Sequence, residues 1–399
     1  MTEILSRRAV GRGRRRRSVG AVQEALFEVE MRPERRFYRQ MLDALSRSGF
    51  GDDALESERV TSRLFGTVWA GQEGPRDGST EEAFGLGLVD YARHCRVPAS
   101  VVVLRTAARI APIREVRDAA LSAAAALVSD GLPEPRWMPP LEALIVGVCW
   151  AYEDVFGDES TVICEFGYGT DLRTAERHAL LVYVDHAIFS VATDVMLTQD
   201  VDSLIRDMRN EAKNIGSLFT LRQVDPAWAR ALLERAFART DLIEGVRTEP
   251  TFAELRALAL ARLAALPDDA GSLPPEPLPP SPQQRDAVVA EFLASKPAQR
   301  LTDQAAVAAV ARRIVEHACS YDPGRLLRVS PAKWETFAFD WLPRQTLEPA
   351  ELAIMADVIR AWTEWAGRWM NLPDPARDEL AAAVEEIVAD VLHARPVAR

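Results

Sequence analysis

Few cysteines and no long apolar run narrow the classes of protein to which this 399-residue chain can belong. The cysteines number four, none forms a CxxC pair, and they are scattered over the chain as Cys95, Cys149, Cys164 and Cys319. This spacing argues against a disulfide framework and against a cysteine-based zinc site, and it favours reduced thiols in a cytoplasm. No apolar run approaches the roughly 18 residues that a membrane-spanning helix needs. We therefore expect a cytoplasmic protein with no membrane segment.

The common sequence signatures of catalysis are also missing. GxSxG, Walker A and HExxH do not occur anywhere in the chain. Glycine pairs such as those in GFGDD and FGYGT do not form a GxGxxG motif between a strand and a helix. We therefore expect no cofactor and no metal, and an enzyme is not the first interpretation.

Lysine is rare, because only Lys213, Lys296 and Lys333 accompany 45 arginines among the 48 basic residues. This bias indicates high-GC codon usage and weakens any argument from arginine enrichment. The net charge of −11 hides an asymmetry: residues 1–17 hold seven arginines and one glutamate, which leaves −17 for the remainder. The chain is an acidic body with a basic N-terminal segment.

The basic segment RRAVGRGRRRR (7–17) has two interpretations. A positively charged segment can bind the phosphate backbone of a nucleic acid through charge alone, and no aromatic residues are interleaved here for base stacking. The candidate contact residues are Arg12, Arg14, Arg15, Arg16 and Arg17. The alternative, which we favour, is a disordered basic tail over residues 1–30, or sequence upstream of the true start, because a helical pattern begins at Met31.

Helical periodicity follows over residues 31–135. In PERRFYRQMLDALSRSGF, apolar residues recur on one face, as expected for an amphipathic helix. Four further helical segments follow without a fixed repeat, so we predict a packed helical domain rather than a helical-repeat array. The proline-rich segment LPEPRWMPP (132–140) then interrupts the chain.

The apolar period changes to two after this break, which predicts strands. Four alternating segments with short connections predict an antiparallel meander, and they are ALIVGVCWAYEDV (143–155), TVICEFGYG (161–169), RHALLVYVDH (177–186) and SVATDVML (190–197). SLFTLRQV (217–224) is a candidate fifth strand between helical segments. The sequence thus predicts an α+β domain over residues 140–266.

The stretch HALLVYVDHAIFSVATDVML (178–197) is the part of the chain that most resembles a metal or acid–base site, because it contains two histidines and two aspartates. Along one extended strand His178 and His186 lie about 26 Å apart, so they cannot bind a common metal. Asp185 and His186 are neighbours and point to opposite faces. A catalytic or ligand site therefore requires Asp185 or His186 to meet Asp194 across a turn. The alternative, which we favour, is that these residues cap strand ends and turn amides.

Four carboxylates surround the predicted turn at Gly157, and they are Glu153, Asp154, Asp158 and Glu159. Oxygen ligands of this kind suit a divalent cation, but the spacing is not that of a calcium-binding loop. We therefore interpret them as solvated turn charges.

Seven prolines in the sixteen residues of PDDAGSLPPEPLPPSP (267–282) predict a polyproline-like linker. Amphipathic helices follow and predict a second helical domain over residues 283–399. One of them, PAELAIMADVIRAWTEWAGRWM, aligns Trp362, Trp365 and Trp369 on one side. Such a stripe serves either as core or as a partner-binding face, because aromatic anchors dominate interface energetics.

Several segments together resemble a known group of proteins. These are EDVFGDESTVICEFGYG, RHALLVYVDH and TDVMLTQDVD, with an LP-P-W connector at residues 132–137 and DWLPR at 340–344. With them the chain resembles a family of uncharacterised high-GC actinobacterial proteins, over most of its length from about residue 97. The resemblance implies this organisation and a bacterial cytoplasm, and it implies no activity.

The sequence thus predicts an α+β protein with an N-terminal helical domain, a central antiparallel sheet with flanking helices, and a C-terminal helical domain. Its predicted function is that of a binding or adaptor protein that acts through protein–protein contacts with an unknown partner. The alternative is an enzyme or small-ligand-binding module with a polar site on the sheet of residues 150–200. A third interpretation is non-specific nucleic-acid binding through the basic tail.

Overall fold

The computed structural model divides the chain into two compact units at residue 140. The residues that it describes are 33–47, 53–72, 76–135, 144–214, 218–269 and 278–393. The predicted basic tail, with Arg12 and Arg14 to Arg17, lies outside these residues, as do residues 270–277 of the predicted proline-rich linker. Each unit is described by itself.

The first unit is helical, as the sequence predicts. Its elements are α2 (Pro33–Arg47), α3 (Ala54–Ala70), α4 (Ser79–Cys95), α5 (Pro98–Ile110) and α6 (Arg114–Ser129). Asp53 begins α3, because its side chain accepts a hydrogen bond from the backbone N–H of Glu56 at 2.8 Å. Between α3 and α5, the Arg109 guanidinium donates to the Glu58 carboxylate at 2.6 Å with both side chains buried.

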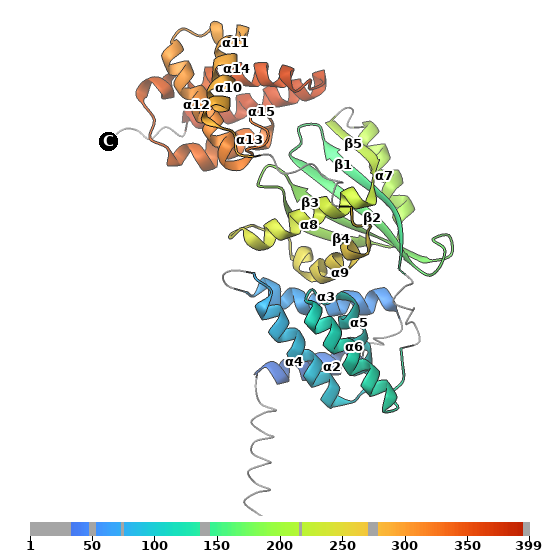
Figure 1. The fold of residues 1–399 in the computed structure, drawn as a ribbon. Helices are drawn as coiled ribbons and strands as arrows, with labels where there is room; N and C mark the ends of the chain where they lie inside the picture. The colour runs from blue at the N-terminus through green and yellow to red at the C-terminus, as the bar shows by residue number, and fades with distance from the viewer. Residues whose placement is uncertain are drawn as a thin grey trace, which may run out of the picture. The chain divides into compact units, whose positions relative to one another are not determined.

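The second unit contains a five-stranded antiparallel sheet (Figure 1). The strands are β1 (Leu144–Asp154), β2 (Glu159–Tyr168), β3 (Glu176–Asp185), β4 (Val191–Thr198) and β5 (Phe219–Val224). Their order is β4-β3-β2-β1-β5, so the first four form a meander and β5 pairs with the free edge of β1. This arrangement confirms the predicted α+β class and the predicted antiparallel sheet.

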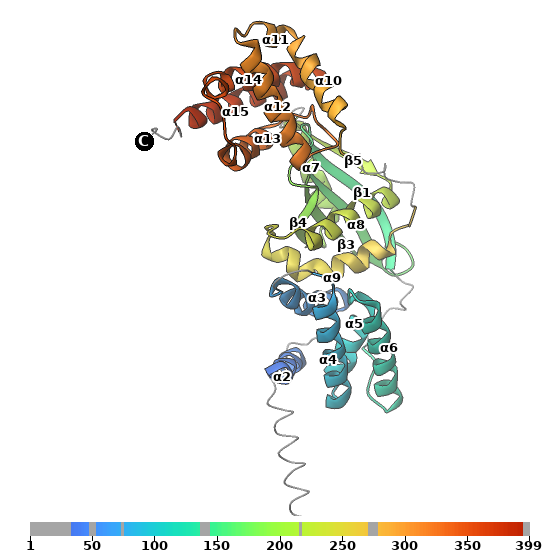
Figure 2. The ribbon, with the colours of Figure 1, turned by 60° about the vertical axis from the view of Figure 1, so that its left-hand side comes forward.

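Helices cover both faces of the sheet. Leu181 and His178 differ in parity along β3, so they point to opposite faces. On the Leu181 face, α7 (Val201–Asn214) packs through Val201 and Ile205. On the His178 face, α9 (Pro250–Ala265) contributes Arg262, whose Nε donates to His178 Nε2 at 3.0 Å. Helix α8 (Pro226–Leu242) packs on this second face beside α9 (Figures 1 and 2).

The C-terminal helices of the second unit enclose an aromatic core. They are α10 (Pro282–Leu293), α11 (Lys296–Gln299), α12 (Gln304–Tyr321), α13 (Pro331–Glu335), a π-helical turn η3 (Thr336–Trp341), η4 (Leu342–Arg344), α14 (Pro349–Trp369) and α15 (Asp374–His393). The Trp362 ring is fully buried and lies 4.8 Å from the ring of Phe292. Among the described residues, no helix combines the length and the apolar character needed to cross a membrane.

The sheet and the C-terminal helices share part of one core. Phe156, from the turn between β1 and β2, packs in the same hydrophobic cluster as Phe292 and Trp362. The second unit therefore contains both regions, although the sequence predicts a domain boundary at residues 267–282. That boundary stays a prediction, which proteolysis tests below.

Candidate functional site at the strand ends

A cavity of about 870 Å³ lies where the β1–β2 turn meets the loop that follows α12. One part of its wall is apolar and comes mainly from Val155, Phe156, Leu278, Pro280, Ala287, Val288, Leu326, Leu327, Trp369 and Met370. The other part is polar and includes Glu153, Asp154, Glu159, Ser160, His186, Arg325 and Arg328. The cavity thus joins an apolar surface to a row of strand-end polar groups.

The β1–β2 turn takes its shape from Asp154. One carboxylate oxygen accepts from the backbone N–H of Phe156 at 2.7 Å, and the other accepts from that of Glu159 at 2.6 Å. Burial is the main cause that raises the pKa of Asp154, and the nearby Asp158 raises it further. Gly157 has φ +71°, and a Cβ there would lie 2.9 Å from an Arg325 nitrogen, so this position requires glycine.

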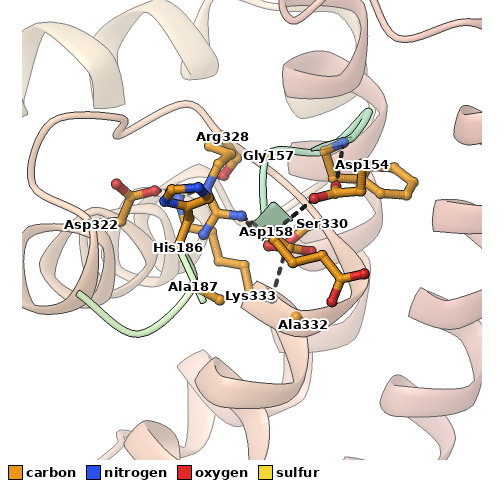
Figure 3. Close-up of polar contacts among 12 residues, drawn as sticks. Asp154, Gly157, Asp158, His186, Ala187, Asp322, Arg328, Ser330, Ala332 and Lys333 are labelled. Carbon is orange, nitrogen blue, oxygen red and sulfur yellow. Dashed lines mark hydrogen bonds and ion pairs between the residues drawn. The ribbon is translucent and has the colours of Figure 1, made fainter. Parts of the chain in front are cut away.

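Asp158 belongs to a buried ion cluster, shown in Figure 3. Arg328 donates through Nη1 to Asp158 and through Nε to Asp322, the latter at 2.6 Å. The hydroxyl of Ser330 also donates to Asp158, at 2.7 Å. Burial works against the charge of Arg328, but Asp158 and Asp322 outweigh it and raise the pKa of the guanidinium. The solvated-charge interpretation of the sequence is therefore wrong for Asp158.

Lys333 anchors the loop that carries Arg328. Its buried ammonium donates to the carbonyl oxygens of Arg328 at 2.6 Å, Arg325 at 3.4 Å and Leu326 at 3.5 Å. Burial, followed by the charge of Arg328, lowers the pKa of Lys333 to about 7. The three carbonyl contacts wrap the loop around one ammonium group.

Each ring nitrogen of His186 lies within hydrogen-bond distance of a serine hydroxyl group. Its Nε2 lies 2.9 Å from Ser160 Oγ, and its Nδ1 lies 3.0 Å from Ser190 Oγ. Burial, followed by the positive charges of Arg325 and Arg328, lowers the pKa of His186 to about 4. The imidazole is therefore neutral near pH 7, and one of its ring nitrogens can accept a hydrogen bond from a serine hydroxyl.

The three candidate residues that the sequence predicts, Asp185, His186 and Asp194, lie at two different places in the structure. Asp185 accepts from the backbone N–H groups of Ala187 at 2.9 Å and Ile188 at 3.1 Å. Asp194 accepts from the backbone N–H of Val195 at 2.7 Å. Asp185 and Asp194 line one cavity of about 410 Å³, whereas His186 lines the larger cavity.

His178 is at the other end of β3 from His186. It is fully buried, and its ring stacks on Phe166 at 5.9 Å and on Tyr168 at 5.3 Å. Among the described residues, no group of three or more His, Cys, Asp or Glu side chains has the arrangement of a metal site. The two histidines thus serve different parts of the fold.

The three tryptophans of α14 differ in their surroundings. Trp362 is buried in the core, and Trp365 is partly buried against that core. Trp369 is 60% exposed and lies at the wall of the 870 Å³ cavity. The helical period predicts their shared side but not this difference.

Sequence reasoning missed the residues that face the strand ends from the C-terminal region. These residues are Arg325, Arg328 and Lys333. In a chain with 45 arginines, the presence of Arg325 or Arg328 does not by itself indicate a functional site. One signal was present, because Lys333 is one of only three lysines. Rarity alone does not identify the site, because Lys213 and Lys296 are exposed and only Lys333 is buried.

No protein-family profile, curated protein or solved structure matches the chain. Membership of the actinobacterial family suggested by the sequence stays a prediction.

Proposed function

We propose that the second unit binds a small amphipathic molecule in the 870 Å³ cavity. The observation that carries this proposal is the division of the cavity wall into an apolar part and a polar part. Its volume is within the range of roughly 300–1,000 Å³ that is usual for small-molecule sites. The exposed ring of Trp369 adds an apolar surface at the wall.

The carboxylates of the polar wall offer open acceptor positions, whereas its two arginines are engaged in contacts within the protein. Arg325 already donates to Asp322 at 3.0 Å, to the Gly157 carbonyl at 2.8 Å and to the His186 carbonyl at 3.2 Å. A carboxylate has about four lone-pair sites, and the contacts of Glu153 and Glu159 use only some of them. We infer a ligand with hydroxyl or amine groups beside an apolar body.

Trp fluorescence and thermal melting test this proposal with three amphiphiles of equal chain length below their micelle concentrations. Octyl glucoside and octylamine should raise the melting temperature and change the emission of Trp369, whereas octanoate should do so far less. A Trp369→Phe variant identifies the part of the emission change that comes from this ring. Equal responses to all three amphiphiles would argue against the proposed acceptor-rich wall.

A matched pair of variants locates the binding. Ala287→Trp places a large ring in the cavity, whereas Ala290→Trp adds the same ring at an exposed position of α10 outside the cavity wall. Binding of octyl glucoside should be lost in the first variant and kept in the second. Binding that survives Ala287→Trp means that the molecule is held elsewhere.

A second candidate function is ester hydrolysis, favoured by the hydrogen-bonded set Ser160–His186–Ser190. A hydroxyl nucleophile, a neutral base and a third group that orients the base form the general arrangement for nucleophilic catalysis. Ser160 Oγ would attack the ester carbonyl while His186 Nε2 takes the hydroxyl proton and passes it to the leaving alcohol. Water would then release the acid and restore Ser160.

Covalent labelling separates this second candidate from simple binding. A fluorophosphonate should attach to Ser160 with loss of fluoride, as mass spectrometry of the β2 peptide would show. Ser160→Ala and His186→Gln should abolish the label, and Ser203→Ala on α7 should not. An unlabelled Ser160, beside a serine esterase labelled under the same conditions, removes the hydrolase candidate.

The predicted adaptor function remains the third possibility. Burial of Trp362 favours the small-molecule proposal over it, because the aromatic stripe that suggested a partner is largely used in the core. A protein partner that competes with octyl glucoside for the Trp369 surface would instead favour the adaptor.

A further inference from the structure

The cavity of about 410 Å³ at Asp185 and Asp194 has a polar lining throughout. Its three carboxylates come from Asp185, Asp194 and Glu249. Two threonines, a tyrosine and an arginine complete the lining, so none of its seven residues has a purely hydrocarbon side chain. The cavity therefore differs in chemistry from the 870 Å³ cavity, much of whose wall is apolar.

A bulge in β4 gives this cavity its shape. The pairing of β3 with β4 shifts between Tyr183 and Val184, so Thr193 is the extra residue of the bulge. The Thr193 carbonyl accepts from the backbone N–H of Glu249 at 2.9 Å, which fixes the segment 247–249 against β4. The bulge and this segment, which leads into α9, line the cavity together.

Asp185 and Asp194 each keep one carboxylate oxygen open. Oδ1 of Asp185 accepts from two backbone N–H groups of the β3–β4 turn. Oδ1 of Asp194 accepts from the Val195 N–H at 2.7 Å and from the Thr251 hydroxyl. Neither Oδ2 accepts a hydrogen bond from a described group, and neither carboxylate has an ion pair with a described cation. Both Oδ2 atoms are therefore acceptors that a bound molecule can use.

The other lining residues add open donors. The Arg247 side chain is exposed, and within the part of the chain that the structure describes it has neither an ion pair nor a hydrogen bond. The hydroxyls of Thr193 and Thr248 also bond to no described group. A guanidinium carries five N–H donors, and a hydroxyl both donates and accepts. The cavity thus offers donors and acceptors in one lining.

This lining suits some classes of ligand and disfavours others. An apolar molecule finds no hydrocarbon side chain, and an anion meets three carboxylates but one guanidinium. Among the described residues, no three His, Cys, Asp or Glu side chains are arranged to hold a metal ion. An organic cation would leave the donors of Arg247 unused and lie close to its positive charge. A molecule with several hydroxyls uses both kinds of group, because each hydroxyl donates to one partner and accepts from another.

We propose that this cavity binds the pyranose ring of a neutral sugar. The Oδ2 atoms of Asp185 and Asp194 would accept from the ring hydroxyls, and the Arg247 guanidinium would donate to them. Tyr183 contributes the one aromatic ring of the lining and gives the C–H groups of the sugar an apolar surface. The volume is within the range of roughly 300–1,000 Å³ that is usual for small-molecule sites. The proposal does not depend on the ligand of the 870 Å³ cavity.

Ligand-observed NMR with the full chain tests the proposal with the methyl α-pyranosides of glucose, galactose and mannose. At least one should bind with a dissociation constant in the millimolar range, and the three should differ because their hydroxyls point in different directions. Cyclohexanol, which has a six-membered ring but a single hydroxyl, should not bind measurably. No binding by any pyranoside, or equal binding by the pyranosides and cyclohexanol, would overturn the proposal.

Competition with spermidine separates a sugar site from a surface that attracts cations. Spermidine should not displace the bound pyranoside at constant ionic strength, because the sugar is held by donors as well as by carboxylates. Displacement by spermidine would assign the cavity to organic cations and overturn the sugar.

Variants of two lining residues locate the binding. Arg247→Gln and Asp194→Asn should each weaken pyranoside binding about tenfold, through loss of a hydrogen bond to a charged group. Arg209→Gln and Asp207→Asn remove the same charges from exposed positions of α7 outside the cavity and should change nothing. Arg247 bonds to no described group, so its variant should keep the parent melting temperature. If that variant folds normally and also keeps the parent affinity, the sugar is held elsewhere and the proposal fails.

The variant Ala287→Trp distinguishes this site from the small-molecule site proposed above. Its added ring fills the 870 Å³ cavity, and Ala287 is outside the lining of the 410 Å³ cavity, so pyranoside binding should survive. Loss of pyranoside binding in Ala287→Trp would assign the sugar to the larger cavity and overturn the site proposed here.

Discussion

Asp158 and Arg328 form an ion pair across 170 residues of sequence, and their side chains are only 14% and 3% exposed. A buried ion pair is costly to desolvate, so it persists only where further hydrogen bonds satisfy both groups. Ser330 donates to Asp158 and Asp322 accepts from Arg328, which meets that requirement. This pair joins the β1–β2 turn to the C-terminal helices beside the proposed ligand cavity.

Removal of one partner of this pair should be strongly destabilising. Arg328→Met leaves the Asp158 and Asp322 carboxylates buried without their guanidinium, and it should lower the free energy of unfolding by about 3–5 kcal/mol. Urea unfolding followed by circular dichroism measures this change. Arg360→Met, which breaks an exposed pair with Glu385, should cost less than about 1 kcal/mol. Similar losses in both variants would contradict the special role of the buried pair.

Acid should destabilise the second unit from about pH 6.5 downward. Burial is the main cause that lowers the pKa of His186 to about 4 and that of His317 to about 3. In the unfolded chain both histidines gain a proton as the pH falls below about 6.5. In the folded chain the two imidazoles stay neutral until the pH approaches their lowered pKa values. Stability therefore falls as the pH falls through this window, by up to about 1.4 kcal/mol per pH unit for each histidine.

Urea unfolding at pH 4.5, 5.5, 6.5 and 7.5 measures this slope. His186→Gln and His317→Phe should each flatten it, because each removes one group that gains a proton on unfolding. The carboxylate of Asp322 contributes at lower pH, because its folded pKa lies below its usual value and its stabilisation is lost only as the pH falls through it. A stability that does not change between pH 4.5 and 7.5 would contradict the buried neutral histidines.

Trypsin should cut within or near residues 267–300, for instance at Arg285, and the two fragments should stay associated. Phe156 in the helical core and the Asp158–Arg328 pair supply contacts across the cut. Size-exclusion chromatography of the nicked protein should show one species, and Phe156→Ala should release two. Separation of the fragments in the parent chain would instead favour the independent domains that the sequence predicts.

Asp185→Ala should lower the free energy of unfolding by about 1–3 kcal/mol, because two turn amides lose their acceptor. Asp185→Asn keeps an acceptor oxygen and should cost less than the alanine variant. Thermal melting of both variants measures the difference. Equal costs would show that the negative charge of Asp185 matters more than its hydrogen bonds.

Local sequence determined the elements of the sheet. Alternating apolar residues and the Gly157–Asp158 turn predict β1 and β2 close to their observed bounds, because side-chain period and turn chemistry depend on neighbouring residues. The same parity argument predicts that Asp185 and His186 diverge, and in the structure they line different cavities. The observed helix starts at Asp225–Pro226 and Ser330–Pro331 likewise depend on adjacent residues, because the Asp or Ser side chain caps the helix and proline occupies its first turn.

Tertiary structure alone decided which of these residues form the sites. The approach of Ser160 to His186 requires the strand register, in which Ser160 is opposite Val184. The partner of Asp158 lies 170 residues away, and no local pattern distinguishes Arg328 from the other arginines. Burial, ion pairing and cavity walls depend on contacts between distant segments. For this reason the strands and helices could be predicted from the sequence, whereas the sites could not.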